Sequence, residues 1–225
     1  GEVDDGLALL DEAMVAVTVG EISPIPAGII YCAVIETCHL AFDLHRAHEW
    51  TRALDRWCEA QQKLVAFSGQ CQMHRAELYR LHGAWTEAID AAKTAQDLAF
   101  RGDRMATYGG FYQQGEIHRL RGEFDAAEAA YLHAQDTGFP AHPGLALLRL
   151  AQGRPDQAQS LLRQAMDGID PGYRRLMLAA RVEIELAAGD APAARAAVEE
   201  LDSLCASIDM PMLHALAEQS QAAVL

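Results

Sequence analysis

The sequence predicts an all-α fold built from helix-turn-helix pairs that stack side by side. A short phrase, consisting of a turn residue, a bulky residue and an alanine at fixed spacing, recurs along the chain. Apolar residues on both sides of the phrase follow the period of a helix. Hydrophobic residues make up 51% of the 225 residues, which is enough to fill the interior of such a stack.

The recurring phrase places a turn residue five positions before an alanine, with a bulky residue between them. It is clearest at 83–88 and 122–127, where the turn residue is glycine and the bulky residue is Trp85 or Phe124. Consecutive copies are separated by 41, 39, 31 and 36 residues, and their turn residues are Phe42, Gly83, Gly122, Gly153 and Gly189. Glycine supplies the positive φ with which one helix ends, and alanine lets the next helix pack closely.

The first helix of each pair precedes the turn residue, and the second helix follows it. First helices are expected at residues 69–82, 105–121, 142–152 and 171–188. Second helices are expected to bury small or apolar residues after the repeat alanine, such as Ala92, Tyr131 and Leu162. Proline, glycine or a capping residue predicts helix breaks at 23–24, 102–103, 140–143, 170–171 and 209–211. The apolar run at 25–34 is too short to span a bilayer and is predicted to be a buried helix.

The charge balance argues against direct contact with nucleic acid. Lys and Arg total 18 against 32 Asp and Glu, a formal net charge of -14, so most of the surface would repel a phosphate backbone. The cysteines are odd in number and far apart, which is typical of reduced thiols and not of a disulfide framework. They are Cys32, Cys38, Cys58, Cys71 and Cys205. We therefore expect a cytoplasmic protein without a signal peptide or membrane segment.

The repeated phrase resembles the tetratricopeptide repeat (TPR), whose pattern ends its first helix with Gly-x-aromatic-x-x-Ala and places a further aromatic and alanine on the second helix. The resemblance covers most of the chain. It implies a right-handed α-α superhelix of TPR-like helix-turn-helix repeats, forming a single TPR-like α-solenoid domain over residues 1–225. In such a superhelix the first helices line a concave groove that binds a partner.

Three segments, 70–78, 115–124 and 144–153, also look like the helical-repeat region of large LuxR-type bacterial transcriptional regulators. In that family, the resemblance implies, such a stack precedes a C-terminal helix-turn-helix and can follow an NTP-binding module. Residues 215–225 read as an ordinary apolar helix, and no Walker-type Gly-x-x-x-x-Gly-Lys-Ser/Thr occurs. The chain also opens inside an amphipathic pattern without an initiator methionine, so we expect a fragment of a longer regulator.

Alignment of the copies on their turn residue predicts which side chains line the groove. Six residues before the turn stand Glu36, Glu77, Glu116 and Glu183, and three residues before it stand His39, Arg80, Arg119, Leu150 and Leu186. The tetratricopeptide resemblance implies that these offsets face the groove, with Cys32, Met73 and Tyr112 one turn earlier. The predicted ligand- or partner-binding residues are Glu36, His39, Glu77, Arg80, Tyr112, Glu116 and Arg119. The alternative is that these are ordinary pairs of opposite charge on a helix surface, with a structural role alone.

Acidic residues at these positions favour a ligand with a cationic or mixed face. Repeats that bind the C-terminal carboxylates of chaperones use Lys, Arg and Asn there, so the resemblance makes an acidic tail a poor candidate. The expected partner is a peptide, a protein or a small-molecule effector in the groove, and assembly into a homo-oligomer is left open.

Metal binding, cofactor binding and catalysis are not expected. Residues 71–74 and the Cys38-His39 pair contain zinc-ligand types, but their spacing supplies no second pair. No Gly-x-Ser-x-Gly or comparable nucleophile turn occurs. The glycine pair Gly109-Gly110, within an aromatic cluster at 108–112, indicates close approach of either a ligand or a neighbouring helix.

The sequence is therefore compatible with functions of different classes. The first is a ligand- or partner-binding sensor or scaffold segment of a transcriptional regulator, whose DNA-binding domain lies outside this chain. The alternative is a general protein-protein interaction adaptor with TPR repeats. A third, an enzyme on a helical scaffold, would need a metal or a reactive side chain.

Overall fold

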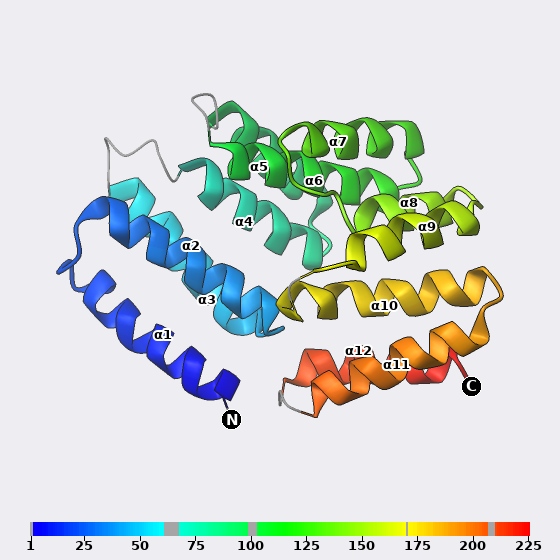
Figure 1. Cartoon of the computed structure of the whole chain (residues 1–225). Coiled ribbons are helices and arrows are strands. Elements are labelled where there is room, and N and C mark those ends of the chain that lie inside the picture. Colours follow the sequence, from blue (N-terminus) through cyan, green and yellow to red (C-terminus); the bar gives the residue numbers. More distant parts are fainter. Residues whose placement is uncertain (1, 61–67, 99–102, 170, 207–209) are drawn as a thin grey trace. The chain divides into compact units, whose positions relative to one another are not determined.

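The computed structural model describes residues 2–60, 68–98, 103–169, 171–206 and 210–225. All regular elements within these residues are α-helices, so the predicted all-α class is confirmed. The chain divides into two compact units, whose helices are labelled in Figure 1. The N-terminal unit comprises Glu2–His39 and Leu44–Phe139, and the C-terminal unit comprises Leu40–Asp43 and Pro140–Leu225.

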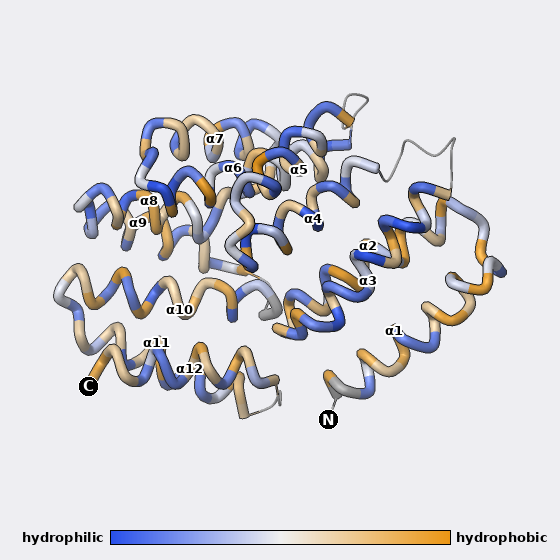
Figure 2. Tube along the Cα trace, turned by 180° about the vertical axis from the view of Figure 1, so that it is seen from behind, coloured by the Kyte–Doolittle hydropathy of each residue, from blue (hydrophilic) through white to orange (hydrophobic). Residues whose placement is uncertain are grey.

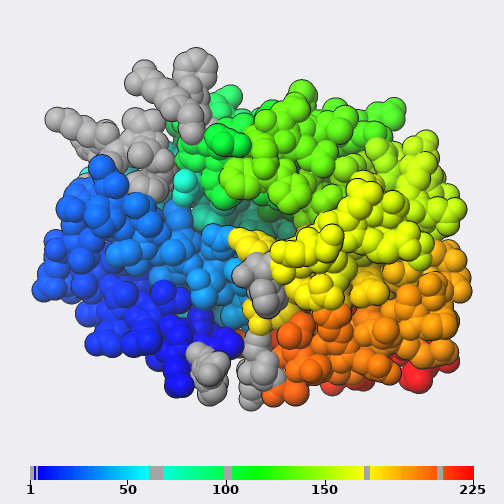
Figure 3. Space-filling view, in the orientation of Figure 1, coloured from blue at the N-terminus to red at the C-terminus, as the bar shows by residue number. Residues whose placement is uncertain are grey.

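The helices of the N-terminal unit follow one another as packed pairs. They are α1 (Glu2–Thr18), α2 (Pro24–Leu40), α3 (Leu44–Ala60), α4 (Ser68–Leu81), α5 (Trp85–Leu98), α6 (Arg104–Leu120) and α7 (Phe124–Asp136). Helix α4 packs on α3, α5 and α6, and helix α6 packs on α5 and α7. The first helices α4 and α6 thus contact each other as well as their own second helices, as stacked hairpins do. In Figure 3, residues 103–139 of this unit (green) form one continuous surface.

The C-terminal unit also consists of successive packed helices. They are α8 (Gly144–Ala151), α9 (Pro155–Met166), α10 (Pro171–Ala187), α11 (Ala191–Cys205) and α12 (Pro211–Ala223). Helix α8 packs on α9, and α10 packs on both α9 and α11. Hydrophobic and hydrophilic residues alternate along α10 in Figure 2. Helix α11 buries one face, which carries Ala194, Val198 and Leu201. That the two units form one solenoid over residues 1–225 stays a prediction.

The turns between paired helices share one backbone geometry. Gly83, Gly122, Gly153 and Gly189 have φ values of 76, 75, 73 and 79°. At each turn the glycine N–H donates to the carbonyl three residues earlier, and the next N–H donates to the carbonyl five residues earlier, as in Gly122 to Arg119 and Glu123 to His118. This is the Schellman ending of a helix. Phe42, the turn residue of the copy without glycine, has the same positive φ, 62°.

The alanine that closes each repeat is fully buried. The exposed fraction is 0% for Ala47, Ala88, Ala127, Ala158 and Ala194. Ala92, Tyr131 and Leu162 of the second helices are also buried, as predicted. A methyl group at the crossing point lets the two helices of a pair approach closely, so each repeat contributes one turn and one close contact.

The predicted helix boundaries agree with the structure to within two residues. Positions 102, 170 and 209 of the predicted breaks lie outside the described residues, and helices begin shortly after them at Arg104, Pro171 and Pro211. Proline stands at or next to the first position of α9, α10, α11 and α12, where its missing N–H costs no hydrogen bond.

The predicted buried helix at 25–34 is a helix, but it is only partly buried. This run is part of α2, which buries Tyr31 and Val34 but exposes 61% of Ile25 and 56% of Ile29. The helix is apolar on all sides, while its neighbours cover one side. Among the described residues, no helix is both long enough and apolar enough to cross a membrane.

Candidate functional site

The residues predicted to line a groove lie on the three first helices of the N-terminal unit. Helix α2 carries Glu36 and His39, α4 carries Glu77 and Arg80, and α6 carries Tyr112, Glu116 and Arg119. Apart from Glu36, which is exposed, they are partly or fully buried and bind other side chains of the unit. We call these seven residues the polar strip.

His39 joins α2 to α4. Its Nδ1 lies 3.1 Å from Oε2 of Glu77, and the two side chains are 13% and 27% exposed. The other carboxylate oxygen of Glu77 lies 4.0 Å from Nη2 of Arg80. The ring of His74, also on α4, lies beside that of His39, with 6.3 Å between the ring centroids. A carboxylate, a guanidinium and two imidazoles therefore meet between the two helices.

The charges in this group set the protonation of its members. Burial raises the pKa of the Glu77 carboxyl, but His39 and Arg80 outweigh burial and lower that pKa to about 2. Burial lowers the pKa of His39, and Glu77 outweighs it, so the net pKa is raised. Burial and the nearby His39 lower the pKa of His74 to about 4. At neutral pH, Glu77 is a carboxylate and His74 is a neutral imidazole.

Arg80 joins α4 to α6. Its Nε donates to Oε1 of Gln113 at 2.7 Å, and Gln113 is buried. The side chain of Arg80 is 17% exposed. This hydrogen bond from a charged donor to a buried amide favours one register between α4 and α6.

Glu116 joins α6 to its second helix, α7. Its carboxylate accepts from Tyr131 Oη at 2.6 Å and from Arg119 Nη2 at 2.9 Å. Burial raises the pKa of Tyr131 well above its usual range, and the charge of Glu116 raises it further. Burial lowers the pKa of Arg119, but Glu116 outweighs burial and the net pKa is raised. Glu116 is 7% exposed, so its two partners replace water around the carboxylate.

Tyr112 lies in an aromatic cluster. Its ring stacks on Tyr108 at 5.6 Å and is tilted on Tyr131 at 5.8 Å. Tyr108 in turn contacts Phe139 at 5.3 Å. Burial raises the pKa of Tyr112 well above its usual range.

The glycine pair in this cluster serves helix packing. A Cβ at Gly110 would lie 2.7 Å from the backbone oxygen of Ala92 on α5, and a Cβ at Gly109 would collide with Met73 on α4. Of the two alternatives, a neighbouring helix and not a ligand therefore occupies the space beside these glycines.

Apolar side chains stand next to the polar strip. Leu81 and Leu120 are 42% and 45% exposed, and they follow Glu77 and Glu116 by four residues, on the same face of their helices. The sequence alone did not predict these two leucines as part of the surface, although both stand two residues before the turn glycine of the two clearest repeats. Nor did it predict His74, Gln113 and Tyr131 as partners of the polar strip.

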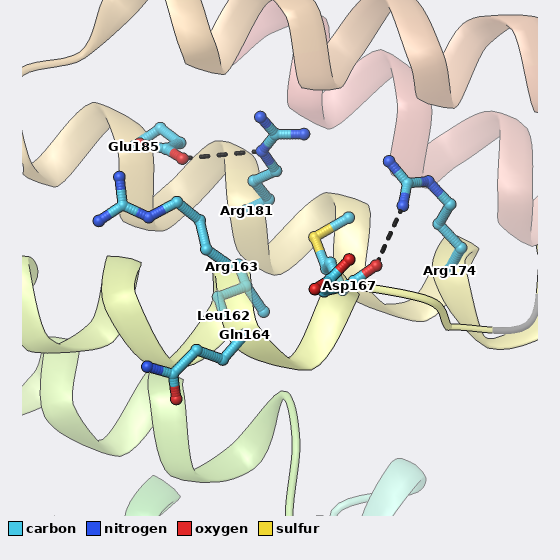
Figure 4. A pocket seen from close by; sticks show the side chains of 8 residues that line it. Leu162, Arg163, Gln164, Asp167, Arg174, Arg181 and Glu185 are labelled. Atoms are coloured by element: carbon cyan, nitrogen blue, oxygen red, sulfur yellow. Dashed lines mark hydrogen bonds and ion pairs between the residues drawn. The ribbon is translucent and has the colours of Figure 1, made fainter.

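The C-terminal unit contains a separate cavity of about 440 Å³ between α9 and α10. Arg163, Arg174 and Arg181 line it together with Asp167 and Glu185 (Figure 4). Arg174 binds the carboxylate of Glu200 through two nitrogens, and Arg181 Nε lies 3.6 Å from Glu185. Two of the three arginines that line the cavity, Arg174 and Arg181, thus already bind carboxylates.

Comparison with known proteins leaves the chain without an assigned family. No protein-family profile and no curated protein matches it. Among solved structures it is similar to a tetratricopeptide repeat protein from Parabacteroides merdae, with 13% sequence identity over 98% of this chain and 93% of that chain. The TM-score is 0.41, so the fold rests on the helix pairs and turns described above and not on this match.

Proposed function

We propose that the chain is a protein- or peptide-binding module of TPR-like repeats, whose contact surface lies on the first helices of the N-terminal unit. The observation that carries this proposal is a repeated triplet. Glu77, Arg80 and Leu81 on α4 occupy the same offsets as Glu116, Arg119 and Leu120 on α6, and α4 packs on α6. A surface with the same chemistry at each step of a stack suits an extended partner.

The chemistry of the surface selects the partner. The two exposed leucines offer apolar area that a partner can bury. The partly exposed edge of Glu77 and the exposed Glu36 favour a cationic group over an acidic tail. The expected partner is therefore a peptide segment with apolar and basic residues, bound without catalysis.

A random-peptide display library screened against the purified chain tests this proposal. We expect selected peptides to contain Lys or Arg beside apolar residues. Their affinity should fall at least about tenfold in the double variant Leu81→Glu/Leu120→Glu, because two apolar contacts are lost and two carboxylates enter the interface.

The matched control is Leu98→Glu/Leu132→Glu, which adds the same charge on the second helices α5 and α7, where these leucines are 37% and 49% exposed. It should bind the peptides like the unchanged chain. Equal loss in both double variants, or no loss in either, would refute the proposed surface.

The narrower hypothesis, a sensor segment of a LuxR-type regulator in the cytoplasm, is supported by the resemblance of segments 70–78, 115–124 and 144–153 and by the five free cysteines. The coding sequence beyond Leu225 tests it. A basic helix-turn-helix there would favour the regulator, whereas another type of sequence would favour the general adaptor.

A further inference from the structure

Three metal-ligating side chains converge between α2 and α4, at one end of the polar strip. They are His39, His74 and Glu77, and one ligand atom of each lies within 4.8 Å of the other two. His74 and Glu77 are three residues apart and so share a face of α4, while His39 approaches from α2. Short ligand spacings in the sequence do not reveal this site, because His39 is 35 residues from His74 along the chain.

His74 lacks the partners that a buried imidazole needs. It is 5% exposed, and neither of its ring nitrogens has a hydrogen-bond partner among the described residues. Nε2 of His39 is buried and unpartnered in the same way. Buried polar atoms are almost always satisfied, so these three nitrogens point to a bound species that supplies the missing contacts.

We propose that His39, His74 and Glu77 form a binding site for a divalent transition metal of the zinc type. Two imidazoles and one carboxylate are a donor set that zinc accepts, and the fourth position is then open to water or to a group from a partner. The site shares Glu77 with the proposed peptide surface, but it rests on the convergence of side chains from α2 and α4 and is tested by metal binding alone.

The surroundings of the site are compatible with a cation. Glu36 and Glu77 bring two negative charges against the one positive charge of Arg80, whose Nη2 is 4.0 Å from Glu77 and whose Nε is bound to Gln113. With Zn–N distances of about 2.0–2.1 Å, tetrahedral ligand atoms lie about 3.3 Å apart. The ligand atoms of His39, His74 and Glu77 lie within 4.8 Å of one another, so metal binding requires small side-chain rotations that move these atoms by about an ångström. A metal here would cross-link the first helices of two successive pairs.

Titration of the metal-free full chain with Zn²⁺, and with Co²⁺ as a coloured probe, tests the proposal. We expect one equivalent of metal per chain and visible cobalt bands without the near-ultraviolet charge-transfer band that thiolate ligands produce. The absence of that band distinguishes this site from the five free cysteines. His74→Gln should weaken binding by more than about tenfold, since one of three protein ligands is lost.

Two further variants make the test independent of any single substitution. His39→Gln, on the other helix, should weaken binding to a similar degree, and His45→Gln should not, because His45 is exposed on α3. Circular dichroism checks that each variant is folded. No stoichiometric binding, binding that persists in both ligand variants, or a thiolate band would overturn the proposal, and a buried water would then be the partner of His74.

Discussion

At the scale of single residues, backbone conformation and not space selects glycine at the turns. A Cβ added at Gly83, Gly122, Gly153 or Gly189 would meet no atom within 4 Å. Each nevertheless has a φ near +75°, which side chains with a Cβ rarely adopt. Phe42 has a φ of 62° at the equivalent turn, so a residue with a Cβ adopts a positive φ at one of the five turns.

Gly122→Ala should therefore destabilise the chain by about 1 kcal/mol, through strain at positive φ alone. Gly6→Ala, inside α1 where a Cβ also meets nothing within 4 Å, should stabilise by about 0.5–1 kcal/mol, because alanine favours a helix. Urea unfolding of the two variants gives both values. Changes of the same sign would show that free space, and not φ, governs these positions.

At the scale of helices, small side chains decide which elements approach closely. Gly110 of α6 packs against the backbone of Ala92 on α5, and Gly115 of α6 packs against the ring of Tyr131 on α7. Helix α6 therefore packs closely against a second helix on each of two sides, α5 and α7. Arginine side chains form hydrogen bonds across other helix contacts, from Arg80 to Gln113 between α4 and α6 and from Arg174 to Glu200 between α10 and α11.

Gly110→Ala should destabilise the chain by about 1–3 kcal/mol, because the new methyl group would force α6 away from α5. The obstacle is a backbone oxygen, which cannot rotate aside as a side chain can. Thermal unfolding measures the loss, with Gly6→Ala as the comparison at an unobstructed site. A melting temperature equal to that of the unchanged chain would contradict the close contact.

The pair between α10 and α11 should make the stability depend on pH. The hydrogen bond from Arg174 lowers the pKa of Glu200, and burial opposes this only in part. A lowered pKa contributes stability above the ordinary carboxyl pKa of about 4.3, and this is lost as the pH falls through the lowered value.

Glu200→Gln should therefore be less stable than the unchanged chain at pH 7 by less than about 1 kcal/mol, as expected for a partly exposed pair. The difference should shrink as the pH falls below about 4, because the Glu200 carboxyl is then protonated in the unfolded chain and, once the pH passes its lowered pKa, in the folded chain as well. Urea unfolding at the two pH values measures it. A difference that grows in acid would contradict the assigned direction of the pKa.

At the scale of the whole molecule, charge limits the partners. The formal net charge of -14 repels polyanions over most of the surface. The two arginines of the polar strip also form hydrogen bonds within the chain, Arg80 with Gln113 and Arg119 with Glu116. Both features favour a protein or peptide partner over nucleic acid.

We expect no retardation of duplex DNA by this chain in a gel-shift assay at about 150 mM salt. A basic peptide from the library screen, added in place of DNA, serves as the positive control for folded and active material. Retardation of DNA that weakens steeply as salt is added would contradict this prediction, because it would reveal a basic patch that releases counterions.

The sequence by itself determined the helix pairs, because the features that make them are local. A glycine that ends a helix and an alanine five residues later depend on the neighbouring chain, so Gly83–Ala88 and Gly122–Ala127 could be read directly from their order. The sequence also placed the polar strip on three first helices, since the offset from each turn is fixed by the helical period.

Only the tertiary structure decided which side chains meet. That His39 binds Glu77, that Arg80 binds Gln113, and that Tyr131 covers Glu116 depend on the register between helices. This register is set by packing over many residues, among them the contact of Gly110 with α5, and no single position encodes it. For the same physical reason, His74 looked like an ordinary helix residue until α2 was placed beside α4.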